Sequence, residues 1–420
     1  MTAADTFFPA PATAAAIPFL QRVRVENFKS IGKCDVQLQR LTLLVGRNGA
    51  GKSNFLDALR FVVDGLQTSL EHAIKSRGGI QMVRRRSTGH PHNLAIGLEF
   101  NLPDHSSGTY SFVIAARKDG GFSVKRESLK IIAPHHSPLF YTAEEGAIVS
   151  SNPATLPRGA ADRLYLVLAS GVEAFRPAYD ALSSMGFYNL NPEAMKELQS
   201  PDAGELLHRD GDNIASVVAR LQAEAPGEKE RAESYLQKIV GDVAGVDRVQ
   251  FGPRETLEFR QLVLGSQHPW KFPAANMSDG TLRALGILIA VSQLAHVRGR
   301  VRLVGIEEPE TALHPSAAHA LMDALTEARE STQVLITTHS ADLLDRVDLD
   351  ITGLLAVQSV AGTTQIAPID GASLEAIRTH LYSAGEMLRM DQFEPDANDV
   401  RRQLQLPMFD HFSDRPGDAQ

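Results

Sequence analysis

The sequence has few cysteines and no long apolar runs. Its single cysteine, Cys34, excludes an internal disulfide framework and a cysteine-based metal cluster, and it fits a reducing cytosol. The longest apolar run, "LGILIAVSQLA", is roughly half of the ~20 residues that a bilayer-spanning helix needs. We therefore expect a cytoplasmic protein without a membrane span.

The first twenty residues also lack the features of a signal peptide. They contain Asp5 but no lysine or arginine, and three prolines interrupt the apolar residues. We expect a disordered Ala/Pro-rich tail over residues 1–20.

An excess of basic charge is missing as well. The chain carries 42 basic and 50 acidic residues, a net charge of -8, so no overall field attracts it to nucleic acid. Any contact with DNA needs a local patch, and the stretch "SRGGIQMVRRRSTGH" offers Arg77, Arg84, Arg85 and Arg86. A solvated charged loop is an equally good interpretation of this run.

The 420 residues, 43% of them hydrophobic, have the composition of a soluble globular protein. This length suits two or three average domains, or one large α/β domain with an insertion. We expect five segments: the tail (1–20), an N-terminal lobe with a β-meander (21–134), a loop and helical insertion (135–250), a C-terminal lobe (251–358) and a C-terminal extension (359–420).

Hydrophobic periodicity places the elements within these segments. Alternating residues between 94 and 132 predict three antiparallel strands, and residues 135–160 show no clear period and are expected to form a loop. Helical patterns follow at about 161–185, at 212–225 with Asp212 as its cap, and at 227–243.

A phosphate-binding loop is the clearest motif. The stretch "GRNGAGKSN" fits G-x-x-x-x-G-K-[ST] between the apolar strand "LTLLV" and a helical pattern. Glycines let the backbone N–H groups face phosphate oxygens, and the helix start adds a positive dipole end. Lys52 is predicted to contact the β and γ phosphates and Ser53 to ligate Mg²⁺. The predicted nucleotide-binding residues of this loop are Gly46, Asn48, Gly49, Gly51, Lys52, Ser53 and Asn54.

Two consecutive acids end the buried strand in "VRLVGIEEPE". We expect this strand beside the one before the phosphate loop, with its carboxyl end at the γ-phosphate. Glu307 is then expected to hold Mg²⁺ directly or through water, and Glu308 to polarise the attacking water. A solvated acidic strand end is the alternative interpretation.

A histidine ends the apolar strand in "VLITTHSADLL". His339 is expected to reach the γ-phosphate, because it is the third polar element at the same sheet edge. A purely structural histidine is the alternative. His314, just after "EEPETAL", is expected on the loop beside the catalytic acid.

A second anion-binding helix start occurs in "NMSDGTLRALGILIA". Ser278 is expected to cap the helix near Thr281, and Gly280 to leave its backbone open. Since one phosphate loop already serves a nucleotide, the second site is expected to contact the γ-phosphate bound by another copy. An ordinary N-cap without a ligand is the alternative.

In chain order, the phosphate loop, the helix start at Ser278, the acid pair and the histidine resemble the motifs of an ABC-type ATPase of the RecF/SMC/Rad50 group. More closely, "RVENFKSIGKCDVQL", "LLVGRNGAGKSNFLDAL" and "IEEPETALHP" resemble the AAA-type ATPases grouped with overcoming-lysogenization-defect (OLD) proteins. The resemblance covers roughly residues 21–60 and 270–395. It implies an α/β P-loop NTPase fold of ABC/SMC-like type, with a mixed sheet flanked by helices, an antiparallel β-meander and a helical insertion.

The resemblance also implies ATP and Mg²⁺ as cofactors, ATP-driven homodimerisation, and work on DNA or in anti-phage defence. Carried onto this chain, the resemblance implies that Ser278 and Gly280 form the signature motif and that Glu308 is the catalytic base. It also implies that His339 is the switch residue that contacts the γ-phosphate. The chain departs from the wider group at Glu307, where aspartate is usual, and at His314, where transporter-like cassettes have aspartate. The glutamine that closes the Mg²⁺ shell has no clear equivalent, and Gln81 is a weak candidate.

Two further features are not expected in this chain. Long coiled-coil arms would need sustained heptads, and residues 160–245 offer only short helices. A Toprim nuclease domain, as in full OLD proteins, would need its own acidic metal cluster, which the residues after "THS" lack.

The sequence leaves three functions open. The first is an ATPase that acts on DNA, or that controls a nuclease or toxin effector from a neighbouring gene. The second is the ATP-binding cassette of a transporter. The third is an ATP-gated scaffold that does not hydrolyse ATP, against which the intact Glu308 argues.

Overall fold

The computed structural model describes residues 17–87, 93–117, 121–293, 301–346 and 349–406. Most of the expected N-terminal tail lies outside these ranges. At its end, however, Phe19 and Leu20 are buried, and strand β1 begins at Leu20. Strand β1 therefore begins one residue before the expected start of the N-terminal lobe at residue 21.

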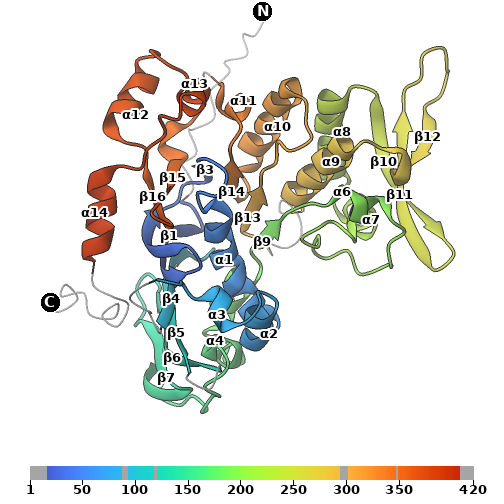
Figure 1. The fold of residues 1–420 in the computed structure, drawn as a ribbon. Coiled ribbons are helices and arrows are strands. Elements are labelled where there is room, and N and C mark those ends of the chain that lie inside the picture. The colour runs from blue at the N-terminus through green and yellow to red at the C-terminus, as the bar shows by residue number, and fades with distance from the viewer. Residues whose placement is uncertain (1–16, 88–92, 118–120, 294–300, 347–348, 407–420) are drawn as a thin grey trace, which may run out of the picture.

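One large mixed sheet runs through the molecule (Figure 1). Its strand order is β8-β7-β6-β5-β4-β1-β2-β16-β15-β3-β14-β13-β9. The strands are β1 (Leu20–Phe28), β2 (Ile31–Gln37), β3 (Leu41–Val45), β4 (Asn93–Asn101), β5 (Ser107–Ala116), β6 (Phe122–Ile132), β7 (Leu139–Glu144), β8 (Ala147–Asn152), β9 (Gly186–Tyr188), β13 (Leu303–Glu307), β14 (Gln333–Thr338), β15 (Leu354–Val360) and β16 (Thr363–Pro368).

The strands β15, β3, β14, β13 and β9 are parallel, so their carboxyl ends meet at one edge. Helices cover both faces of this part, which explains the nearly continuous apolar sequences of the strands. Alternate residues serve the two faces. In β3, Leu44 belongs to the core that includes α1 (Lys52–Gln67), whereas Leu43 belongs to the core that includes α9 (Asp279–Ser292) and α10 (Pro315–Ala328).

The position of the acid-bearing strand differs from the sequence expectation. β14 lies between β3 and β13, so the strand that ends in Glu307 is not the direct neighbour of the strand before the phosphate loop. The reason is that the chain inserts the strand before His339 between the two. The carboxyl ends of all three strands still share one edge, so the expected meeting of these residues does not depend on direct pairing.

The meander expected from alternation is present as β4, β5 and β6, and it extends further than expected. Residues 135–160, expected to be a loop, contain the antiparallel hairpin β7–β8. This hairpin was missed because intermediate and exposed residues dominate its burial pattern, so the period-2 alternation is weak.

The helices of the insertion also differ in detail. In place of one helix over 161–185 there are two short ones, α4 (Tyr165–Ala169) and α5 (Arg176–Ser183). α7 (Ile214–Glu224) has Asn213 at its N-cap with no side-chain cap, and the Asp212 carboxylate instead contacts His208 at 2.6 Å. α8 (Pro226–Val240) lies where it was expected.

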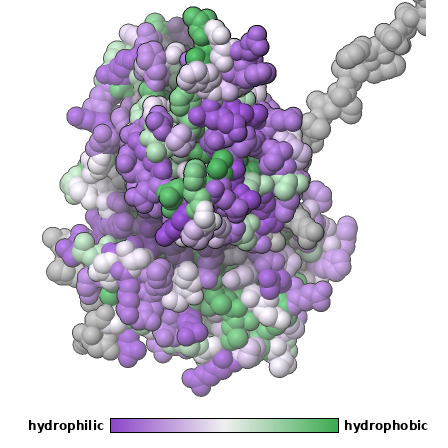
Figure 2. All heavy atoms as spheres, turned by 90° about the vertical axis from the view of Figure 1, so that its right-hand side faces the viewer, coloured by the Kyte–Doolittle hydropathy of each residue, from purple (hydrophilic) through white to green (hydrophobic). Residues whose placement is uncertain are grey.

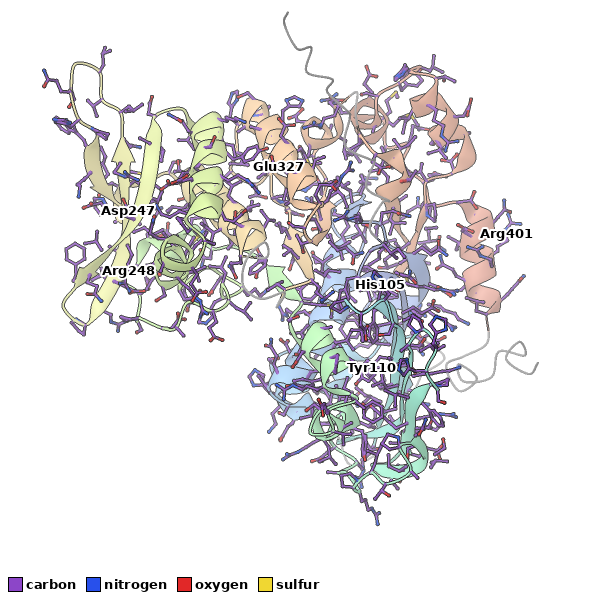
Figure 3. The ribbon with its side chains drawn as sticks, turned by 180° about the vertical axis from the view of Figure 1, so that it is seen from behind. His105, Tyr110, Asp247, Arg248, Glu327 and Arg401 are labelled. Carbon is purple, nitrogen blue, oxygen red and sulfur yellow. The ribbon has the colours of Figure 1, made fainter. Side chains whose placement is uncertain are left out.

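A separate three-stranded sheet consists of β10 (Val243–Phe251), β11 (Arg254–Gln261) and β12 (Trp270–Pro273). It packs on α7 and α8, and α8 packs on α9 and α10. Figure 3 shows Asp247 and Arg248 on this small sheet and Glu327 on α10. Glu327 accepts a hydrogen bond from the Tyr235 hydroxyl of α8, which ties α10 to the helices beneath the small sheet.

The remaining helices are short or terminal. α2 (Leu70–Lys75) and α3 (Ile80–Val83) follow α1, and α6 (Pro192–Lys196) packs on α9. α11 (Ala341–Leu344) packs on α13 (Ala384–Arg389), and α12 (Gly371–Arg378) precedes that helix. α14 (Ala397–Gln405) covers β2 and β16 and ends the described chain.

A buried carboxylate fixes α4 to the meander. Glu127 of β6 accepts hydrogen bonds from the hydroxyls of Tyr110 (3.1 Å) and Tyr141 (2.8 Å) and from the backbone N–H groups of Tyr165 (2.5 Å) and Leu166 (2.8 Å). Burial raises the pKa of Glu127, and these four donors oppose that shift. The carboxylate thus caps the start of α4 from the sheet.

We expect Glu127→Gln to lower the free energy of unfolding by about 1–3 kcal/mol, because its amide N–H₂ group leaves a buried donor facing the Tyr165 N–H. Chemical denaturation measures this change. Glu144→Gln, at an exposed glutamate of β7, is the control and is expected to stay within about 0.5 kcal/mol of wild type. Equal stability of the two variants would show that Glu127 does not fix α4.

Candidate functional site

The phosphate loop, residues 46–53, connects β3 to α1 at the carboxyl edge of the parallel strands. Gly51 has φ +106° and Gly49 has φ +79°, both in the left-handed region that favours glycine. A Cβ on Gly46 would lie 2.1 Å from the Val357 carbonyl oxygen of β15. The glycines therefore serve the sharp turn and its close packing against β15.

Lys52 points back into the loop. Its Nζ donates to the carbonyl oxygens of Gly46 (2.6 Å) and Arg47 (3.1 Å), and only 4% of the residue is exposed. Burial lowers the pKa of Lys52, while the charges of Glu308 and Glu310 act in the opposite direction. This buried ammonium group is thus held where an anionic ligand in the loop would stabilise its charge.

The other predicted residues of the phosphate loop differ in how exposed they are. Ser53, in the first turn of α1, and Asn48 are exposed. Asn54 is half-buried, and its amide donates to the Ser30 hydroxyl at 2.6 Å. Ser53 and Asn48 can therefore meet a ligand directly, whereas Asn54 also holds the β1–β2 turn against α1.

Two carboxylates follow at the end of β13. Glu307 is the last residue of the strand, and Glu308 has φ +44°, which turns the chain there. The Glu308 N–H donates to the Thr337 carbonyl oxygen at 3.0 Å, which holds the turn against β14. The two side chains consequently leave the same strand end in different directions.

The histidine at the end of β14 faces these acids. His339 Nδ1 lies 3.4 Å from Glu308 Oε1 and 3.8 Å from Glu310 Oε1. The charge of Glu308 raises the pKa of Lys52 against the effect of burial, so the acid and the histidine lie near the phosphate loop. Three of the predicted elements therefore meet at one edge of the sheet.

Glu310 is a site residue that the motifs did not reveal. Its Oε1 accepts hydrogen bonds from the Thr338 hydroxyl (2.7 Å) and from the His339 backbone N–H (3.3 Å). It thus positions the backbone of the histidine from the loop that follows Glu308. A third acid in "EEPE", three residues after Glu307, is the sequence signal that could have identified it.

Arg283 is a second such residue. It lies in the second turn of α9, and the charges of Glu308, Glu310 and Glu307 raise its pKa against a larger lowering by burial. This half-buried guanidinium group of α9 is thus near enough to the three acids for their charges to act on it. No sequence motif used above singles out this arginine.

Asn189 and Arg209 complete this edge. β9 pairs with β13 up to Tyr188 and Ile306, so the exposed Asn189 follows the strand beside Glu307. The Arg209 guanidinium donates to Glu307 Oε1 at 3.1 Å. Asn189 is therefore the better placed amide for a metal shell, because Gln81 is exposed on α3 and its side chain accepts a hydrogen bond from Arg84.

The helix start at Ser278 has the expected cap. The Ser278 hydroxyl oxygen accepts from the Thr281 N–H at 3.1 Å, and Ser278 and Asp279 are exposed. Lys196 of α6 contacts Asp279 at 2.7 Å. α9 lies among α6, α8 and α10, not against α1 (Figure 1). Among the described residues, no hydrogen bond joins this helix start to the phosphate loop of the same chain.

Gly280 has a packing role that was not expected. A Cβ there would lie 2.4 Å from the carbonyl oxygen of Ala312, which itself has φ +66°. The loop between β13 and α10 therefore lies directly against the start of α9. His314 ends this loop as the N-cap of α10, where its Nδ1 accepts from the Ser316 N–H.

The basic run is only partly available for binding. Arg77 is buried against Asp57 and Asp64, with contacts of 2.8 and 2.9 Å, so the structure removes it from the predicted patch. Arg85 is half-buried and donates to the Thr363 hydroxyl. Arg84 is also half-buried and donates to the Gln81 side chain, so Arg86 is the exposed arginine of the run among the described residues. Residues 88–90 of the stretch lie outside the described residues.

Comparison with known proteins gives this arrangement a family. Residues 41–345, well over half of the chain, match the family described as "AAA domain, putative AbiEii toxin, Type IV TA system". The chain belongs to this AAA-domain family.

Two nucleases are among its relatives. The Old nuclease of Escherichia phage P2 is 22% identical over 77% of the chain and 57% of that protein. The OLD nuclease of Thermus scotoductus is 24% identical over 78% of the chain and 60% of that protein. The chain thus spans less than two thirds of the length of either relative.

A solved SMC head, bound to the C-winged helix domain of ScpA, shares the fold. It covers 85% of the chain and all of that structure, with a TM-score of 0.51 and 13% identity. The expected ABC/SMC-like α/β P-loop fold and the likeness to OLD proteins are therefore confirmed. No helix within the described residues is long and apolar enough to cross a bilayer.

The residues at the carboxyl edge of the parallel strands suit the Mg²⁺ ion that usually accompanies a nucleotide in this family. The exposed Ser53 hydroxyl and the partly exposed Glu307 carboxylate lie at the same sheet edge, and oxygen ligands are those that Mg²⁺ prefers. Arg209 is paired with Glu307 and would compete with Mg²⁺ for this carboxylate.

We expect Arg209→Gln to lower the Mg²⁺ concentration needed for binding of a fluorescent ATP analogue, by a factor of about two to five. Glu307 then loses a competing cation, and the effect is modest because the pair is partly exposed. Arg254→Gln, at an arginine that bonds Ser200, is the control. A lower Mg²⁺ requirement in the control Arg254→Gln would argue against this competition. An unchanged Mg²⁺ requirement in Arg209→Gln would argue against it as well.

Proposed function

We propose that the protein binds ATP with Mg²⁺ and hydrolyses it, as an ABC/SMC-like ATPase. The observation that carries this proposal is the meeting of Lys52, Glu308 and His339 at one sheet edge, with His339 3.4 Å from Glu308. Lys52 and the backbone N–H groups of the phosphate loop would bind the β and γ phosphates. Mg²⁺ on Ser53 and Glu307 would neutralise phosphate charge.

Glu308 is the proposed general base. Its carboxylate would accept the proton of the attacking water, and His339, beside it, would donate a hydrogen bond to the γ-phosphate. Glu310 would keep His339 in place through its backbone N–H. Asn189 would supply the polar side chain near Mg²⁺ that a glutamine provides in the wider group, since the sequence has no clear equivalent of that glutamine.

We expect Glu308→Gln to lower the rate of ATP hydrolysis at least about a hundredfold, since it removes the proton acceptor and keeps the shape of the side chain. Affinity for ATP, measured by calorimetry, is expected to change less than about threefold. Glu330→Gln, at an exposed glutamate beyond α10, is the control for both measurements. Hydrolysis at the wild-type rate in Glu308→Gln would show that another group is the base.

We further propose that two copies close around two ATP molecules, so that Ser278 and Gly280 of one copy contact the γ-phosphate held by the other. The exposed, capped start of α9 and its separation from the phosphate loop of its own chain support this arrangement. The helix start presents free N–H groups and a positive dipole end, which suit an anion.

Ser278→Arg tests this arrangement. The change puts a bulky cation at the helix start, so the variant is expected to bind ATP through its own phosphate loop but to hydrolyse it poorly. Mixing it with Lys52→Ala is expected to restore part of the activity, because a mixed dimer has one intact loop facing one intact signature. Ser234→Arg, at an exposed serine of α8, is the control. Normal hydrolysis by Ser278→Arg alone would reduce the helix start to an ordinary cap.

The ATP cycle would drive or gate the processing of DNA, or a partner effector such as a nuclease or toxin, in anti-phage defence or repair. The two OLD nuclease relatives support this direction. ATPase rates with and without duplex DNA distinguish a DNA-stimulated enzyme from one that answers to another partner. A transporter cassette is the alternative, and a scaffold that binds ATP without hydrolysis is disfavoured by the pairing of Glu308 with His339.

A further inference from the structure

Two cavities on one side of the molecule join into a single groove. One has a volume of about 720 Å³ and the other about 580 Å³, and both are lined by Gln67, Glu205 and Leu206. α1 and the loop 202–209 form walls of the larger cavity, and α5 continues the wall in the smaller one. Figure 2 shows the surface receding between the upper and lower parts of the molecule.

The floor of this groove is β9, the last strand of the large sheet. Residues 186–188 line the larger cavity, and β9 pairs with β13 on one side only. An edge strand with an open side is a template for a further strand. The other outer strand of the sheet is β8, whereas Gly186 and Phe187 of β9 line the larger cavity.

Backbone alternation shows which groups face the groove. Just beyond β9, the N–H of Asn189 donates to the carbonyl oxygen of Arg209 at 2.9 Å. The N–H of Asn191 donates to the carbonyl oxygen of Asp210 at 3.0 Å. In an extended chain every second N–H points the same way, so the N–H and carbonyl groups of Phe187 face the groove. Among the described residues, the Phe187 N–H has no partner outside the strand ladder.

The backbone of residues 209–210 thus lies beside the chain just beyond β9, and the larger cavity opens next to it. Apolar side chains from three elements surround that place, namely Val63, Met185 and Leu206. Charged residues of both signs stand around them, including Arg60 and Asp202. An extended chain that alternates apolar and polar residues matches both the strand edge and the apolar walls.

We propose that this groove binds an extended segment of a partner polypeptide, which adds to the sheet as a strand beside β9. The joined cavities and the unpaired edge of β9 suit an extended peptide better than a compact small molecule. The peptide would bond the Phe187 N–H and carbonyl and place every second side chain against Leu206 and its apolar neighbours.

The groove ends at a residue of the ATP site. Arg209 lines the larger cavity and also donates to Glu307 at 3.1 Å. A peptide that binds against Leu206 contacts the loop that carries Arg209, and a shift of Arg209 away from Glu307 would free a proposed Mg²⁺ ligand. This consequence rests on the proposed ATPase function, whereas binding of the peptide itself does not.

Selection from a phage-displayed library of linear twelve-residue peptides on the full chain, without nucleotide, tests the proposal. We expect enriched peptides with alternating apolar residues. Calorimetry with the synthetic peptide is expected to show at least about tenfold weaker binding to Leu206→Arg, a loss of about 1.4 kcal/mol. Leu198→Arg, at an exposed leucine outside the groove, is the control and is expected to bind like wild type.

N-methylated peptides test the strand geometry without altering the protein. Methylation of the alternate N–H groups that face β9 should abolish binding, and methylation of the intervening ones should not. Hydrogen exchange at the Phe187 amide should slow when the peptide binds. The proposal is overturned by a library without enriched peptides, by equal binding to Leu206→Arg, or by equal effects of both methylation patterns. None of these results depends on ATP hydrolysis.

Discussion

The arrangement of this protein depends on one geometric constraint, that neighbouring parallel strands end at the same edge of a sheet. Four of these parallel strands, β3, β14, β13 and β9, are far apart in the sequence. Their carboxyl ends nevertheless place the phosphate loop, His339, the acid pair and Asn189 along the same edge of the sheet. Apolar side chains on both faces of these strands hold that register in place. A change in pairing between two of the strands would separate the groups of the site.

The second constraint on the candidate site is the charge of its buried side chains. Lys52 and Arg283 are cations whose burial lowers their pKa, and each feels the acids that follow β13. One comes from the phosphate loop and the other from the helix that starts at Ser278. The charges of the acids therefore act on cations of two helices that belong to different cores of the molecule. We interpret this placement as the physical basis on which nucleotide contacts at either helix would affect the same carboxylates.

Much of this site could be predicted because its motifs are local. A glycine-rich turn between a strand and a helix, an acid pair after an apolar strand, and a Ser-Asp-Gly cap each need only a few adjacent residues. Arg209, Arg283 and Asn189 could not be found in this way, since their roles come from pairing and packing between distant segments. The hairpin β7–β8 was missed for a different reason, because weak alternation leaves it without a sequence pattern.

The central claim is that ATP joins two copies through the loop of one and the signature helix of the other. The most direct measurement is the molar mass in solution, by light scattering, with Mg²⁺ and a slowly hydrolysed ATP analogue. The account predicts twice the chain mass of 45.6 kDa when the analogue is present and a lower mass without it. A chain that binds the analogue fully and keeps a mass of 45.6 kDa would contradict it.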